Sequence, residues 1–285
     1  MRPEAVLQPT VSFLQGSAGP LALHDWPMPG PDARATVLIV HGLGEHAGRY
    51  AQVAAHLREW GFAVRAYDHQ GHGQSGGARG RLHTPDGLLR DLETVLDDTL
   101  AQADAARRPL VLLGHSMGGL LVARAVACSR HRVDAVVMSS PAFGIHTSAV
   151  QKWLLTLMPH LLPQLTLSNG LNPRYVARDP EAVRAYQADP LVHDRISAGL
   201  GGWIWREGAR VLEQAAQWDT PALLVYAGTD RLVDPAACDL FAARASAERV
   251  TAQRFEAMYH EVFNDPEREQ VFALLRRWLD ARFSV

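Results

Sequence analysis

Three residues of this chain have the types and the order that nucleophilic catalysis requires: a serine, then an aspartate, then a histidine. Ser116 lies in "LVLLGHSMGGLLVARAV", between a strand-like apolar run and a helical pattern, with Gly114 and Gly118 two places on either side. A strand-to-helix turn of this kind is so tight that neighbouring side chains would clash, and glycines avoid the clash. The spacing therefore predicts a nucleophile elbow at Ser116, rather than a serine that only caps a helix.

A serine hydroxyl needs a base, and the base needs an acid that orients it. Asp230 follows the apolar run "PALLVYAG", and His260 follows the next strand-like run, "TAQRFEAM". Both side chains are therefore expected at the same edge of a parallel sheet as Ser116. Asp234 is the alternative acid, although the proline after it favours a helix cap. His193 is the alternative base, but no predicted strand places it.

A second G-x-S-x-G pattern is centred on Ser75, in "DHQGHGQSGGARGRLH". It follows a predicted strand, but no helix comes directly after it, so we interpret it as a structural loop. No Gly-Lys-Ser/Thr sequence follows, which excludes a phosphate-binding P-loop.

The loop "VHGLGEHAGRY" is predicted to complete an oxyanion hole. The backbone amide of Leu43 is the candidate donor in this loop, and that of Met117 is the second donor, at the start of the helix after the serine. His41, Glu45 and His46 have side chains of metal-ligating types, as do His69 and His72. The glycine-broken turn and the lack of an H-E-x-x-H helix favour the oxyanion interpretation, so no metal or other cofactor is expected.

Strand-like and helical segments alternate through most of the chain. Strands are predicted at 36–40, 62–67, 109–114, 133–140, 221–228 and 251–258, and helices at 50–60, 84–106, 117–128, 234–245 and 267–280. Thr84 is the expected N-cap of the second helix, with a proline at its first position. This alternation predicts an α/β fold with a mostly parallel sheet covered on both faces. "VSFLQG" and "PLALHDW" at the start of the chain predict an antiparallel hairpin at the sheet edge.

The alternation stops between residues 144 and 217, where prolines interrupt helix-like pieces. We expect a helical cap at 144–217, inserted into a core formed by 1–143 and 218–285. The apolar stretch "VQKWLLTLMPHLLPQL" has two interpretations: it lines an acyl tunnel or contacts a membrane surface, or it packs on the core and on other cap helices. It is too short and too broken to span a bilayer.

Composition excludes some function classes. The net charge is −2 and the sequence has no long run of like charges, so it does not predict the basic surface that binding to nucleic acid requires. Two cysteines far apart fit a reducing compartment, and the first residues lack the apolar core of a signal peptide, so a cytoplasmic location is expected. Nothing in the sequence predicts an oligomeric state.

The motifs "HGLGEHAGRY", "DHQGHGQSGG", "GHSMGG", "GTDRLVD" and "YHEVFND" occur in the same order as in a known family, and "VRAYQADPLVHDRIS" resembles the cap of that family. The chain resembles the monoacylglycerol lipases and related lysophospholipases of the α/β-hydrolase superfamily over nearly its whole length. The resemblance implies Ser116, Asp230 and His260 as the catalytic triad, with the Leu43 and Met117 amides as the oxyanion hole.

The resemblance also implies that Glu45, Arg49, His115 and Tyr186 contact the glycerol end of the substrate. One departure is Leu43, where some relatives have alanine, and its bulk would narrow the glycerol end.

The expected function is hydrolysis of a single-chain lipid ester, in particular of monoacylglycerol to fatty acid and glycerol, through an acyl-enzyme on Ser116. Lysophospholipase and short-chain carboxylesterase activities are alternatives, because they and the peptidases and peroxidase-like enzymes of this fold use the same triad. Dehalogenases are disfavoured, since they need a carboxylate at the position of Ser116. A non-catalytic ligand-binding protein is a further alternative, but such proteins usually lose a triad residue or the elbow.

Overall fold

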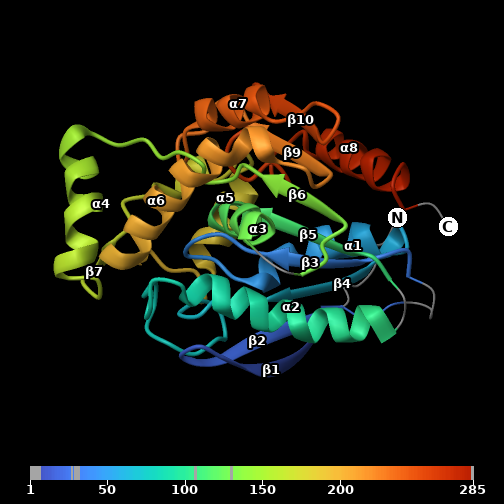
Figure 1. The fold of residues 1–285 in the computed structure, drawn as a ribbon, viewed down its shortest axis with the longest axis horizontal. Helices are drawn as coiled ribbons and strands as arrows, with labels where there is room; N and C mark the ends of the chain where they lie inside the picture. Colours follow the sequence, from blue (N-terminus) through green and yellow to red (C-terminus); the bar gives the residue numbers. More distant parts are fainter. Residues whose placement is uncertain (1–7, 27, 29–32, 106–107, 129–130, 284–285) are drawn as a thin grey trace.

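One sheet runs through the molecule and positions every predicted catalytic residue (Figure 1). The computed structural model describes residues 8–26, 28, 33–105, 108–128 and 131–283. The strands of the sheet in this part of the chain are Thr10–Gly16 (β1), Gly19–Trp26 (β2), Thr36–Val40 (β3), Ala63–Tyr67 (β4), Leu110–His115 (β5), Ala135–Ser139 (β6), Ala222–Ala227 (β9) and Val250–Phe255 (β10).

The sheet has the strand order β1-β2-β4-β3-β5-β6-β9-β10. β2 pairs antiparallel with β1 and with β4, and all later neighbours in the order are parallel. This confirms the mostly parallel α/β sheet and the N-terminal hairpin at its edge. The carboxyl ends of β5, β9 and β10 consequently lie at one edge of the sheet.

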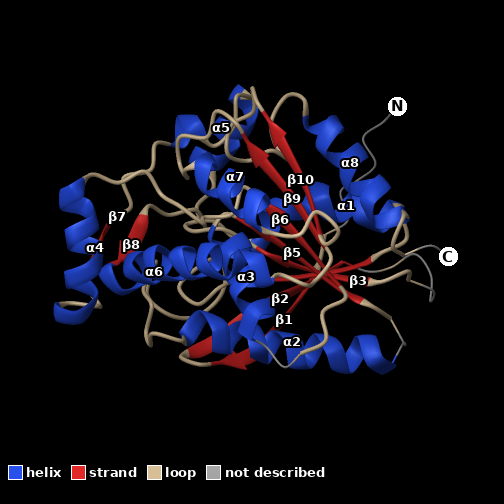
Figure 2. Cartoon of the chain, turned by 45° about the horizontal axis from the view of Figure 1, so that its top comes forward, coloured by secondary structure: helices blue, strands red, loops and turns tan. Residues whose placement is uncertain are grey.

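Helices cover both faces of the sheet (Figure 2). One face packs against α1 (Ala51–Glu59) and α8 (Arg268–Asp280), and the other against α2 (Gly87–Ala105), α3 (Met117–Cys128) and α7 (Pro235–Arg244). All residues of β3 are buried, and successive side chains alternate between the two hydrophobic clusters. A strand buried on both faces needs an unbroken apolar sequence, which explains the run "TVLIV".

Two predicted boundaries were wrong, because a local turn replaces regular structure in each case. α2 begins at Gly87 rather than at Thr84, since the Gly87 amide donates to the Thr84 carbonyl (3.0 Å) and closes a turn ahead of the helix. The predicted end of this helix at residue 106 lies outside the described residues. β10 ends at Phe255 rather than at 258, because the Met258 amide turns back to the Phe255 carbonyl (3.2 Å).

The segment 144–217 is mainly helical, and part of it packs on the sheet layers. Its elements are α4 (Ala149–Leu161), β7 (Thr166–Ser168), a 3₁₀ turn (Pro173–Tyr175), α5 (Pro180–Ala188), β8 (Arg195–Ser197), α6 (Ala198–Gln214) and a second 3₁₀ turn (Ala215–Gln217). Leu200, Trp203 and Ile204 of α6 join the hydrophobic cluster that contains α3. The short antiparallel pair β7–β8 was not predicted.

α4 stands at one end of the molecule, away from the sheet, in both views (Figures 1 and 2). Its first turn is fixed by a capping box, in which the Ser148 hydroxyl accepts from the Gln151 amide. None of its residues is buried, although it is rich in leucine. No helix in the described part of the chain is long and apolar enough to cross a membrane.

Candidate active site

The three predicted triad residues follow three strands of the parallel part of the sheet. Ser116 comes directly after β5, Asp230 follows β9, and His260 follows β10. The Nδ1 atom of His260 lies 2.6 Å from a carboxylate oxygen of Asp230, and both side chains are buried. Ser116 and His260 line the same cavity, so the structure brings nucleophile, base and acid together at one sheet edge. Their catalytic roles stay predictions.

The turn at Ser116 has the geometry that its flanking glycines indicate. Ser116 itself adopts a left-handed conformation with φ of 54°, which is unusual for a residue with a side chain. A Cβ atom on Gly114 would lie 2.4 Å from the Gly118 carbonyl oxygen, and one on Gly118 would lie 2.0 Å from the Val40 carbonyl oxygen. The glycines are therefore needed because strand and helix approach closely, while the serine carries the strained backbone.

Asp230 and His260 stabilise each other's charged forms. Burial alone would raise the pKa of Asp230, but His260 and the amides of Leu232 and Val233, which donate to the carboxylate at 2.8 and 3.0 Å, lower it. Burial alone would lower the pKa of His260, but Asp230 raises it above its ordinary value. An ionised Asp230 accepts a hydrogen bond from the Nδ1–H group of His260, and this leaves Nε2 free to take a proton from serine.

This electrostatic pairing predicts the acid limb of the pH–rate profile. His260 must be neutral to act as a base, so kcat/KM should fall as the pH drops through its pKa, with a midpoint above 6.5. In Asp230→Asn the largest raising charge is gone while burial still lowers the pKa of His260, so the midpoint should move to lower pH. Initial rates with a nitrophenyl ester between about pH 5 and 9 would measure both midpoints. Equal midpoints in the two proteins would contradict the pairing.

The two residues whose amides are the predicted oxyanion donors both line the cavity that contains Ser116. Leu43 and Met117 line it, and Met117 is the first residue of α3, whose amide has no acceptor within the helix. The neighbouring amide of Gly42 is already used, because it donates to Glu45 (2.6 Å). This places Leu43 and Met117, rather than Gly42, as candidate donors to a developing oxyanion.

A buried ion cluster closes the polar end of the cavity. The Arg49 guanidinium donates to both oxygens of Glu261, at 2.7 and 2.8 Å, and to Glu45 at 2.5 Å. The Tyr50 hydroxyl donates to the other oxygen of Glu45 (2.7 Å). Burial alone would raise the pKa of Glu261, but Arg49 lowers it to about 2. Glu261 is thus ionised, and sequence reasoning missed it, although it stands directly after His260.

Two further residues implied by the resemblance lie at this polar end. Arg49 stacks on the Tyr186 ring, with its guanidinium carbon 4.7 Å from the ring centroid. The His115 ring lies 4.7 Å from that of His260, and its Nδ1 atom is 3.1 Å from the Ser139 hydroxyl. Burial, followed by the charge of His260, lowers the pKa of His115 to about 4, so His115 is neutral at physiological pH. The structure therefore brings together all four residues predicted for the glycerol end.

The whole cavity has a volume of about 580 Å³, and away from this polar end its lining is mostly apolar. Its apolar lining comes largely from the segment 144–217 and includes Leu154, Leu155, Met158, Leu165, Leu167, Leu171, Val176, Ile196 and Ile204. A pocket of this size, apolar over most of its surface and polar at one end, fits a single-chain amphiphile.

The alternative serine and the alternative acid have structural partners instead. The Ser75 hydroxyl donates to the Asp68 carbonyl (2.6 Å) and accepts from the Ala22 amide (2.8 Å), which ties the glycine-rich loop to β2. The Asp234 carboxylate accepts from the Ala236 amide (3.0 Å) and caps α7. Neither side chain lines the cavity that contains Ser116.

The remaining histidines considered from the sequence bind backbone groups, and His46 Nε2 also lies 2.8 Å from a carboxylate oxygen of Asp189. His193 Nε2 lies 3.1 Å from the Gly71 carbonyl, away from the triad. The Nδ1 atom of His41 lies 2.7 Å from the Gly42 carbonyl oxygen, and its Nε2 atom accepts a hydrogen bond from the His69 amide (2.9 Å). Burial lowers the pKa of His41, His69 and His72. Among the described residues, no group of three His, Cys, Asp or Glu side chains is arranged to hold a metal ion.

Comparison with known proteins places this architecture in a family. The family model described as serine aminopeptidase, S33, matches residues 31–267. A monoacylglycerol lipase of Mycolicibacterium smegmatis is 36% identical over 267 residues, which are 93% of this chain and 94% of that protein. An uncharacterised abhydrolase domain-containing protein of Dictyostelium discoideum is 34% identical over 92% of this chain, and the match spans 28% of that longer protein.

A solved structure shows the same fold. The crystal structure of Paleococcus ferrophilus monoacylglycerol lipase superposes with a TM-score of 0.83 at 33% sequence identity, covering 92% of this chain and 99% of that one. This agreement confirms the predicted α/β-hydrolase fold and the resemblance found in the motifs. The chain belongs to the serine aminopeptidase S33 family of α/β-hydrolases, in which it is similar to monoacylglycerol lipases.

Proposed function

We propose that this protein is a serine hydrolase that cleaves monoacylglycerol to fatty acid and glycerol. The observation that carries the proposal is the His260–Asp230 hydrogen bond of 2.6 Å beside Ser116, in a cavity whose lining is mostly apolar and has an ion-paired end. The names of the M. smegmatis and P. ferrophilus relatives support the same substrate class.

In the proposed mechanism, Ser116 attacks the ester carbonyl while His260 Nε2 takes its proton. The amides of Leu43 and Met117 hydrogen-bond the developing oxyanion. The protonated His260 then gives its proton to the leaving glycerol oxygen, and the acyl-enzyme remains. Water attacks this ester with His260 again acting as base, and the fatty acid and free Ser116 result. Asp230 orients the imidazole and stabilises its charged form throughout.

Our proposal assigns residues 144–217 as a cap over a hydrolase core of 1–143 and 218–285. Support comes from the lining of the cavity, whose apolar part is supplied mostly by this segment. The acyl chain would lie along these apolar residues, with the glycerol end toward Glu45, His115 and Tyr186.

The charge of the polar end favours a glycerol headgroup over a phosphorylated one. Glu45 and Glu261 share the single guanidinium of Arg49, so these three side chains carry a net charge of −1 if all are ionised. Among the described residues, the Arg49 guanidinium makes its hydrogen bonds to carboxylates. A lysophospholipid would bring a negatively charged phosphodiester to this end of the cavity. Arg49 is already paired there and the two carboxylates would repel the phosphate, so lysophospholipids are disfavoured as substrates.

A substrate panel tests the proposal. Turnover of a long-chain monoacylglycerol, a lysophosphatidylcholine and a short nitrophenyl ester would be compared, with Ser116→Ala as blank. We expect the monoacylglycerol to give at least about tenfold higher kcat/KM than the lysophospholipid, because only the glycerol avoids the charge conflict. Turnover of the short ester alone would keep the serine mechanism and remove the lipid assignment.

We further propose that α4 and the chain after it contact a lipid surface. Large apolar side chains are exposed there, including Trp153 and Leu161, each 59% exposed. The same helix supplies Leu154, Leu155 and Met158 to the apolar lining of the cavity, so a substrate leaving a membrane at α4 would reach this lining directly.

Replacing both Trp153 and Leu161 by serine is expected to lower binding to phosphatidylcholine vesicles by about tenfold, since two large apolar anchors are lost. Co-sedimentation measures the bound fraction. The matched control is Phe13→Ser on β1, which removes a side chain that is 60% exposed but lies outside this segment. Equal losses in both variants would show non-specific apolar binding and contradict the proposed contact.

A further inference from the structure

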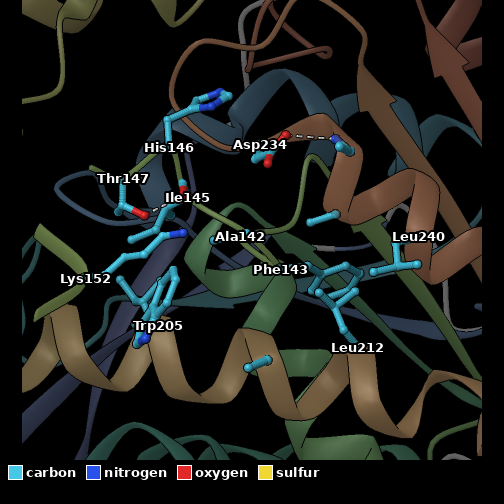
Figure 3. Close-up of a pocket in the computed structure, with 15 residues that line it drawn as sticks. Ala142, Phe143, Ile145, His146, Thr147, Lys152, Trp205, Leu212, Asp234 and Leu240 are labelled. Carbon is cyan, nitrogen blue, oxygen red and sulfur yellow. Dashed lines mark hydrogen bonds between the residues drawn. The ribbon is translucent and has the colours of Figure 1, made fainter. Parts of the chain in front are cut away.

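A second cavity, of about 640 Å³, is shown in Figure 3 and shares part of its lining with the cavity that contains Ser116. Its walls come from the chain after β6, the start of α4, α6 and the start of α7. Residues that line both cavities are Ala142, Ile145, His146, Thr147 and Ile204. A short partition thus separates the two, and the second cavity has the volume of an ordinary organic-ligand site.

The base of this partition is held in place by backbone hydrogen bonds. The Ala142 amide donates to the Ser116 carbonyl (3.0 Å), and the Asp234 amide donates to the Gly144 carbonyl (3.0 Å). α6 approaches so closely that a Cβ on Gly208 would lie 2.5 Å from the Phe143 carbonyl oxygen. The second cavity is therefore bounded by fixed structure and is connected directly to the backbone of the candidate nucleophile.

The cavity has a cationic end and an apolar end. Lys152 extends along the Trp205 ring at one end, with its ammonium nitrogen 5.9 Å from the ring centroid. Phe143, Leu212 and Leu240 line the other end, as Figure 3 shows. The lining thus has the polarity of a single-chain amphiphile with a charged head.

Lys152 is chemically distinctive in this protein. It is the single lysine among 28 lysine and arginine residues in the sequence. Within the described part of the chain, no carboxylate forms a salt bridge with it. The acidic residue of the lining, Asp234, uses one oxygen to cap α7, and Figure 3 shows it above and to the right of Lys152. An anionic ligand would therefore find Lys152 without a competing partner.

We propose that this second cavity binds a fatty acid, with its carboxylate on Lys152 and its chain along Phe143, Leu212 and Leu240. The choice of this anion rests on the proposed function, because ester hydrolysis releases a fatty acid on the other side of the partition. The neutral ester substrate offers Lys152 no charge to pair with, so the cavity discriminates product from substrate. It is a product site adjoining the acyl pocket.

The unique lysine makes the test specific. Reductive methylation with isotope-labelled formaldehyde keeps the charge of Lys152 and gives one side-chain NMR signal besides that of the terminal amine. Ser116 is first blocked with a long-chain alkyl phosphonate, so that the acyl pocket is filled. Dodecanoate is then titrated, with dodecanol and dodecyltrimethylammonium as probes of equal chain length. We expect a saturable shift of the Lys152 signal with dodecanoate only.

Two tryptophan variants distinguish binding in this cavity from general binding of lipid to the protein surface. Ala209→Trp places a ring in the cavity and should abolish saturable binding, whereas Ala243→Trp, on an exposed face of α7 outside the lining, should leave it unchanged. Lys152→Gln, measured by calorimetry, should weaken dodecanoate binding by about tenfold through loss of a charged hydrogen bond.

Three results would overturn the proposal. These are an equal shift with the cationic probe, a shift that does not saturate, and a shift that survives Ala209→Trp. Failure of the phosphonate to label Ser116 would instead contradict the proposed hydrolase mechanism. In that case the unblocked protein can still be titrated, and the Lys152 signal still reports on the second cavity.

Discussion

Replacing Ser116 by alanine is expected to lower kcat for monoacylglycerol by about 10⁴- to 10⁶-fold, because no covalent acyl-enzyme can form without the hydroxyl. The residual rate would come from the oxyanion amides and from substrate binding. The fold should be unaffected, since the hydroxyl is removed while the turn and its glycines stay. Steady-state kinetics on freshly purified protein measures the loss, and circular dichroism checks the fold.

The second G-x-S-x-G pattern supplies a matched control. Ser75→Ala removes a hydroxyl from the same local sequence pattern, but in the described structure the Ser75 hydroxyl bonds the backbone of Asp68 and Ala22. We expect it to cost about 1–3 kcal/mol of stability and to leave kcat within a few-fold of the native value. Mass spectrometry after phosphonate treatment should show one adduct in Ser75→Ala and none in Ser116→Ala. Full activity of Ser116→Ala would exclude the proposed nucleophile.

Arg49→Met is expected to destabilise the protein by about 3–5 kcal/mol at neutral pH, because it leaves the carboxylates of Glu45 and Glu261 buried without their cation. Methionine retains an apolar stem that can pack on Tyr186, so the change isolates the charge. Urea denaturation measures the difference in unfolding free energy between the two proteins.

The pH dependence of this loss follows from Glu261. In the native protein its pKa is lowered to about 2 from an ordinary 4.5, so its contribution to stability is full above 4.5 and is lost as the pH falls toward 2. Without Arg49, burial raises the pKa of Glu261, and stability is lost as the pH rises above 4.5. The destabilisation by Arg49→Met should therefore be larger at about pH 8 than at about pH 5.

A double variant and an exposed variant test this reasoning. Adding Glu261→Gln to Arg49→Met removes one of the uncompensated charges and should recover part of the lost stability. Arg195→Met breaks an exposed pair with Asp194 and should change stability by less than about 0.5 kcal/mol. A loss at Arg49 that is independent of pH and is not reduced by Glu261→Gln would show that packing, rather than charge, is responsible.

The sequence alone predicted the parallel sheet, its edge hairpin and the three strand ends that carry Ser116, Asp230 and His260. These features are local: a strand buried on both faces needs an apolar run, and an elbow needs glycines where strand and helix approach. The predicted helix start at Thr84 and the strand end predicted beyond Phe255 were less accurate, because at each place a single backbone turn replaces the regular structure.

Tertiary structure alone decided how the polar end is built. Arg49 and Glu261 are 212 positions apart, and nothing in either local sequence indicates that they share hydrogen bonds. The segment 144–217 raised the same difficulty, since the apolar pattern of residues 150–165 allows both exposure and burial. The structure places this pattern on α4 and the chain after it and leaves α4 without a buried residue, whereas α6 packs on α3.

The second cavity shows the same division between sequence and structure. That Lys152 is the only lysine can be counted in the sequence, but the count gives no position in space. Only the fold brings it to the end of a cavity whose walls come from α4, α6, α7 and the chain after β6. Local sequence patterns determine elements and their turns, because these depend on neighbouring residues. Cavities and ion clusters depend on contacts between distant segments, which exist only once those elements have packed.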